Sequence, residues 1–181
     1  GLETLSHNEP LQLGQRGRQR AIVREGVYAI NPALFIVMTE DAVFALPRLQ
    51  TAQERALVQK WSQELTDIRG FDPVVVGRQV KSVDPIHPEQ EMMIDSIGIV
   101  TVHDGPSLEP GEIIAPPAGT HVGAPGYHNN YQDPEAFLWA GGRRGCQYVP
   151  LTDGTYFINR WFATVKLIPK TLVPIGHVGV V

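Results

Sequence analysis

Gly142–Val165 reads GRRGCQYVPLTDGTYFINRWFATV and decides the fold, because the chain carries a second version of it. Gly14–Val37 reads GQRGRQRAIVREGVYAINPALFIV, and the two stretches align without a gap. Nine of the 24 positions are identical, whereas unrelated segments of average composition would match at about one or two. Repetition of a supersecondary unit is typical of modules that stack, so the sequence predicts an array rather than one pocket built for chemistry. The residues that define the repeat are Gly14, Gly17, Gly26, Tyr28, Ile30 and Asn31 in the first stretch, and Gly142, Gly145, Gly154, Tyr156, Ile158 and Asn159 in the second.

The pattern within each stretch predicts short strands joined by turns. A glycine after an acidic residue, as in Glu25-Gly26 and Asp153-Gly154, favours a tight turn because glycine adopts positive φ at low steric cost. Apolar β-prone runs follow, and they predict strands at 27–30 and 34–37 and at 155–158, with a further strand over 161–167. Other strands are expected at 74–76, 79–83 and 94–102. The stretch 110–130, rich in Pro, Gly, His and Asn, is expected to be a long loop.

Two segments are predicted to be helical. Thr51 and Glu54 fit a capping box, and an apolar stripe through Leu57, Trp61 and Leu65 follows at helical spacing. This predicts an amphipathic helix over about 52–68. A shorter helix is expected over about 133–140, with an aspartate cap followed by proline.

These elements predict a mainly β (α+β) fold of two tandem small units, sandwich-like or barrel-like, with the first helix inserted. The first β-unit, partial and containing the helix, is expected at 7–93, and the second at 94–175. A fainter echo, Ile97–Val100 against Val178–Val181, indicates that 176–181 begin a following unit. We therefore expect the chain to be a fragment of something larger.

Composition excludes several classes of protein. The chain of 181 residues is 43% hydrophobic and 19% charged, which is ordinary for a folded protein. Its net charge of −4 is too weak to favour nucleic-acid binding. A single cysteine, Cys146, excludes an internal disulfide, and no apolar run is long enough to span a bilayer.

The blocks 95–111 and 131–159 resemble bacterial SPFH (band 7) proteins, which are similar to flotillin, stomatin and prohibitin. The closing stretch, VPIGHVGVV at 173–181, looks like the entry strand of a band 7 domain, so the chain resembles the region upstream of and entering that domain. The resemblance implies a non-enzymatic scaffold that forms homo-oligomers and is associated with a membrane at its cytoplasmic face. It also implies that membrane attachment in the full-length protein uses segments absent here, so this piece itself is expected to be soluble. The β-unit is also similar to the stacked repeats of the vault shell protein.

No catalytic, cofactor or metal constellation accompanies the repeat. The histidines lack the close spacing of metal ligands, and we expect them to be solvent-exposed loop residues. Cys146 follows two arginines that could activate a thiolate, but its counterpart Arg18 favours a tolerant surface site. An enzyme that uses His103, Asp104 and Cys146 has no support from spacing. Candidate contacts with lipid headgroups or a partner are Arg16, Arg18, Arg143 and Arg144.

A different class of function stays open beside the scaffold. The loop 116–132 could recognise a partner or ligand from a rigid β support, as loops on scaffolds commonly do.

Overall fold

The computed structural model describes residues 17–45, 51–82 and 91–180. Along the chain the elements are β1 (Val37–Met38), β2 (Val43–Phe44), α1 (Ala52–Asp67), β3 (Val74–Val76), β4 (Arg78–Ser82), β5 (Glu91–Val102), α2 (Pro134–Trp139), β6 (Gly145–Cys146), β7 (Gly154–Tyr156) and β8 (Ala163–Pro169). The fold is therefore β-rich with two helices among the described residues, and its several small antiparallel sheets do not close into a barrel there.

Strand β5 organises the sheet because it is long enough to pair with three other strands. Its first half pairs with β4, from Glu91 opposite Ser82 to Asp95 opposite Arg78. Its second half pairs with the whole of β8, and its last two residues also pair with β6. Strand β3 pairs separately with β7. Hydrogen bonding thus crosses the expected boundary between residues 93 and 94, because β3 and β4 pair with strands that follow it.

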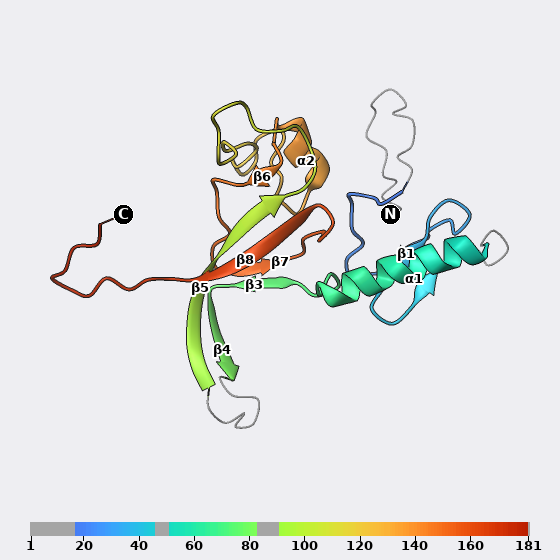
Figure 1. The fold of residues 1–181 in the computed structure, drawn as a ribbon, viewed down its shortest axis with the longest axis horizontal. Coiled ribbons are helices and arrows are strands. Elements are labelled where there is room, and N and C mark those ends of the chain that lie inside the picture. The colour runs from blue at the N-terminus through green and yellow to red at the C-terminus, as the bar shows by residue number, and fades with distance from the viewer. Residues whose placement is uncertain (1–16, 46–50, 83–90, 181) are drawn as a thin grey trace.

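The core lies on β5 and β8 and beneath α2. It contains Val74, Val76, Val100, Val102, Tyr131, Phe137, Leu151, Tyr156, Ile158, Phe162 and Ala163. A close approach requires glycine at position 98, since a Cβ there would lie 2.9 Å from Val165 Cγ1 and 3.1 Å from Leu151 Cβ. Figure 1 shows α1 and β1 to one side of this sheet, and the C-terminal segment extending away on the other.

Both predicted helices are confirmed, with their predicted caps. The Thr51 side chain accepts a hydrogen bond from the Glu54 amide while the Glu54 carboxylate accepts from the Thr51 amide, which completes the capping box. Asp133 accepts from the Ala136 amide and Pro134 occupies the first turn of α2. These local hydrogen bonds satisfy backbone donors that a helix leaves free at its first turn.

The strand predicted at 27–30 is absent, and this prediction was wrong. Its counterpart β7 forms a strand because it pairs with β3, whereas residues 27–30 pair with no strand in the described part of the chain. The strand predicted at 34–37 is shorter and lies at β1, which pairs with β2 across a turn closed by Thr39 and Ala42. β-prone side chains alone do not make a strand, because a strand requires backbone partners.

Candidate interaction site

The two repeated stretches share their local geometry at the two glycines, at the glutamine and at the asparagine turn. Gly17 has a φ of +97° and Gly145 a φ of +115°. Gly26 and Gly154 have φ values of +155° and +159°. The side-chain amide of Gln147 donates to the Gly145 carbonyl at 2.8 Å, and that of Gln19 donates to the Gly17 carbonyl at 3.0 Å.

The asparagine of each stretch closes the same turn. Asn159 Oδ1 accepts from the amide two residues later at 2.9 Å, and Asn31 Oδ1 does so at 2.9 Å as well. The carbonyl of each asparagine then accepts from the amides three and four residues later, at 3.1 and 3.1 Å after Asn31 and at 3.0 and 2.9 Å after Asn159. An asparagine that bonds its own backbone in this way fixes a bend. The duplicated sequence therefore corresponds to a duplicated turn.

The two stretches differ in how deeply their side chains are buried. Tyr156 is 7% exposed but Tyr28 is 51% exposed, and Phe162 is 2% exposed against 74% for Leu34. The second stretch is covered because β7 lies against β3 and β8 against β5. The first stretch has only the short β2 as a strand partner within the described residues, so the face that is core in the second stretch is open in the first.

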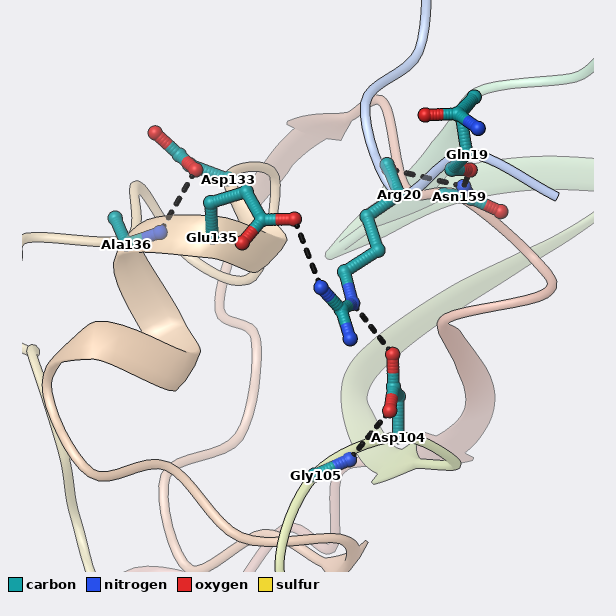
Figure 2. A network of polar contacts seen from close by, with 8 residues as sticks. All are labelled: Gln19, Arg20, Asp104, Gly105, Asp133, Glu135, Ala136 and Asn159. Carbon is teal, nitrogen blue, oxygen red and sulfur yellow. Dashed lines mark hydrogen bonds and ion pairs between the residues drawn. The ribbon is translucent and has the colours of Figure 1, made fainter. Parts of the chain in front are cut away.

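The junction between the stretches is a polar contact centred on Asn159 and Arg20 (Figure 2). The Asn159 amide nitrogen donates to the carbonyls of Gln19 and Arg20, at 2.9 Å each. The Arg20 guanidinium binds Asp104 at 2.6 Å, at the end of β5, and Glu135 at 3.0 Å, in α2. Its hydrogen bond lowers the pKa of Asp104, and the same bond raises the pKa of Arg20.

A second contact of the junction places Arg18 between two indoles. Its guanidinium carbon lies 4.4 Å from the ring centroid of Trp161 and 5.4 Å from that of Trp61, and its tip binds Glu64 at 2.6 Å. The two indoles meet edge to face with centroids 6.3 Å apart. A cation over an indole face is attracted by the quadrupole of the ring. Arg18 therefore links the first stretch to α1 and to the second stretch at once.

The chain was compared with protein-family models, with curated proteins and with solved structures, and none of the three comparisons found a match. Geometry and sequence pattern therefore carry the interpretation of this junction. In the part of the chain that the structure describes, no helix has the length and apolar character needed to cross a bilayer.

The structure separates the four arginines predicted to contact lipid or a partner. Arg16, like Gly14 of the repeat, lies outside the described residues. Arg18 is held at the junction, and Arg143 binds Glu109 at 3.1 Å and Glu112 at 3.0 Å. The Arg144 guanidinium donates to the Ser107 hydroxyl and forms no ion pair within the described ranges. Arg144 thus keeps the least compensated charge of the three described side chains.

Of the residues weighed for catalysis, Asp104 forms an ion pair, and His103 and Cys146 take part in backbone pairing. Asp104 binds Arg20, and the amide of His103 donates to the carbonyl of Phe162 at 2.8 Å. Cys146 is half-buried on β6, where it pairs with Thr101. Within residues 17–45, 51–82 and 91–180, no group of three or more His, Cys, Asp or Glu side chains converges in a way that could hold a metal ion.

One histidine of the loop 116–132 is buried. His128 is 2% exposed, so the expectation that all histidines are exposed was wrong for this residue. Its Nδ1 accepts a hydrogen bond from the Tyr131 amide at 2.7 Å. The centroid of its ring lies 4.6 Å from the ring centroid of Tyr131 and 5.3 Å from that of Phe137. Burial lowers the pKa of His128 and raises the pKa of Tyr131, whose hydroxyl donates to the Val149 carbonyl. The aromatic residues on both sides of His128 in the sequence were the available signal.

Proposed function

We propose that the chain is a self-assembling β-module of a membrane-associated scaffold and has no enzymatic role. The observation that carries the proposal is the unequal burial of two stretches with equal geometry. The first stretch presents Tyr28, Leu34 and Phe35 at 46% exposure or more, where its counterpart is core. Exposed apolar surface of this kind on a rigid turn typically marks an interaction site.

The sequence resemblance and the repeated turn indicate the kind of scaffold. Resemblance to SPFH (band 7) proteins supports a homo-oligomer next to a membrane. The repeated turn supports tandem β-units, sandwich-like or barrel-like, of which the second is complete and the first is partial. Their stacking would explain why the same turn occurs twice in the chain.

Sedimentation velocity and vesicle flotation test the two parts of this proposal. The average sedimentation coefficient should rise with protein concentration, and the chain should float with phosphatidylserine-containing vesicles more than with neutral ones. Arg144→Gln should reduce flotation, while Lys166→Gln, at an exposed position on β8, should not. A chain that stays monomeric at high concentration overturns the self-assembly. Flotation that is unaffected by lipid charge overturns the lipid contact.

A second candidate function rests on the loop 116–132. Three consecutive residues that are not glycines, Asn129, Asn130 and Tyr131, have positive φ values of +46°, +55° and +66°. Such strained backbone persists only where the surroundings fix it, and it concentrates at functional sites. The amide of His128 donates to the Gly119 carbonyl and closes the base of the loop. This favours a loop held ready to recognise a partner.

Replacing only the exposed tip of this loop tests that candidate. Residues 121–125 are all exposed, so a Gly-Ser linker in their place should leave the melting temperature unchanged. Loss of a pull-down interaction would then support recognition by the loop. Retention of every interaction in the linker variant would exclude it.

A further inference from the structure

The hairpin of β4 and β5 is an insertion in the strand that begins the second unit. The Ser96 amide donates to the Gly77 carbonyl at 3.2 Å, and the Ser96 hydroxyl donates to the same oxygen at 3.3 Å. The chain therefore leaves the sheet after Gly77 and returns to the same point at Ser96. Joining 74–77 directly to 96–100 gives the sequence VVVG-SIGIV.

The C-terminal stretch repeats this joined sequence. Residues 173–181 read VPIG-HVGVV, with the same order of apolar residues and glycines. Gly77 has a φ of +103° and its counterpart Gly176 a φ of +83°, so both sites place glycine in the left-handed region. Four of the nine positions are identical, namely those of Val173, Gly176, Gly179 and Val181. The stretch 173–181 is therefore a second version of the segment that begins a unit.

The two versions differ in what covers them. Val74 and Val76 are 5% and 3% exposed, because β3 lies against β7. Their counterparts Val173 and Ile175 are 47% and 104% exposed. Val178 and Val180, which correspond to half-buried positions in β5, are 89% and 94% exposed. The apolar side chains of residues 173–180 thus pack against no other element in the described part of the chain.

The chain therefore presents an uncovered beginning segment at 173–180 and an end segment at 17–38 in which residues 21–29 and 31–36 are exposed. In the second unit the same two kinds of segment cover each other, through β3 on β7 and β5 on β8. The two uncovered segments lie at opposite sides of the molecule in Figure 1, so they do not meet within one chain. A second copy of the chain carries the complementary segment for each, in equal number.

We propose that residues 173–180 of one copy dock on residues 17–38 of another, and so form the contact through which this scaffold assembles. This inference rests on the self-assembly proposed above. The register follows from β3 and β7, where Val74 lies opposite Tyr156 and Val76 opposite Gly154. It places Val173 opposite Tyr28 and Ile175 opposite Gly26 of the neighbouring copy. Because the two surfaces differ, the contact is head-to-tail and generates rings or filaments.

Gly179 offers a substitution that blocks the docked state and spares the free chain. Its counterpart Gly98 is packed so closely that a Cβ would lie 2.9 Å from Val165 Cγ1. In the chain alone, the nearest atom to a Cβ at Gly179 is Val173 Cγ2, at 3.1 Å, on the same exposed segment. Gly179→Leu should therefore weaken self-association by about tenfold or more without changing the melting temperature of the dilute protein. Thr171→Leu adds the same side chain just outside the repeated positions and should associate like the wild type.

A peptide of residues 170–181 tests the docking directly, by calorimetric titration into the G179L chain. The peptide should bind at one per chain, because the end segment of that variant remains free, and a peptide carrying the same Gly→Leu change should not bind. Wild-type chains that stay monomeric would overturn both this contact and the self-assembly. Association that persists in G179L, or a wild-type peptide that fails to bind, would overturn the contact alone.

Discussion

Asn159 is the residue on which the junction depends, because its side chain bonds both repeated stretches. Its oxygen closes the turn before β8, and its nitrogen donates to two carbonyls of the first stretch. Asn31 makes the same turn with its oxygen. Asn31 and Asn159 thus form a matched pair: both close a turn with the side-chain oxygen, and only Asn159 also donates to the other stretch.

Asn159→Asp should lower the free energy of unfolding by about 2 kcal/mol, because a carboxylate oxygen would then face two carbonyl oxygens that lose their donor. The acceptor of the turn is kept, so the change isolates the junction. Asn31→Asp is the matched control and should change the free energy by less than about 0.5 kcal/mol. Equal effects in urea denaturation would show that the Asn159 amide contributes nothing.

The buried His128 predicts a pH dependence of stability. Burial holds its folded-state pKa below the ordinary value of 6.5, so the unfolded chain binds more protons between the two values. The stabilising contribution is then complete above about pH 6.5 and is lost as the pH falls toward the folded-state pKa. Urea denaturation between pH 5 and 7.5 should show this loss in the wild type.

Two variants check the assignment to His128. His128→Asn, which cannot titrate, should remove this part of the pH dependence, while His121→Asn, at an exposed position of the same loop, should keep it. A pH profile that is unaltered by His128→Asn would contradict the assignment.

At the scale of elements, Gly98 determines how closely β5 approaches β8 and the bridge to Leu151. The Gly98 amide donates to the Leu151 carbonyl at 2.9 Å, and the Leu151 amide donates back at 2.8 Å. Gly98→Ala should destabilise the fold by about 1–3 kcal/mol, because the added methyl overlaps Val165 and Leu151. The midpoint of thermal unfolding measures the effect, and Gly179→Ala in dilute protein is the control. An unchanged midpoint for Gly98→Ala would mean that the strands can separate without cost.

Elements governed by local chemistry could be predicted from the sequence, and elements governed by distant partners could not. The caps at Thr51 and Asp133 predicted both helices, because a capping side chain and its amide lie a few residues apart. The pairing of β3 with β7 joins residues 74–76 to 154–156, and no local pattern indicates it. The absence of a strand at 27–30 has the same cause, since it depends on a missing partner rather than on side-chain preference.

In the candidate site, too, local features could be predicted from the sequence and long-range contacts could not. The repeat predicted which positions share a turn, and they do. The ion pair of Arg20 with Asp104 and the burial of His128 could not be predicted in this way. Both depend on how loops fold over the sheet, and the periodicity of the sequence does not encode this.

For the whole molecule, the Arg20 network sets how the first stretch is attached to the sheet. A double-mutant cycle of Arg20→Gln and Asp104→Asn should give a coupling of about 1 kcal/mol, because the pair is only partly exposed and well aligned. Arg24→Gln with Asp104→Asn is the control cycle. Since Arg24 stacks on Phe157, 3.9 Å from its ring centroid, these two changes should be additive. Coupling of equal size in both cycles would point to a general effect of charge.

The indoles that hold Arg18 give the molecule an intrinsic optical signal. Trp61 and Trp161 lie face to edge beneath a cation that leaves when the first stretch detaches, whereas Trp139 is 68% exposed and supplies a constant background. Detachment of the first stretch would therefore shift the emission of two fluorophores while the secondary structure measured by circular dichroism stays in place. Opening of the junction and global unfolding can in this way be followed as separate events in one unlabelled sample.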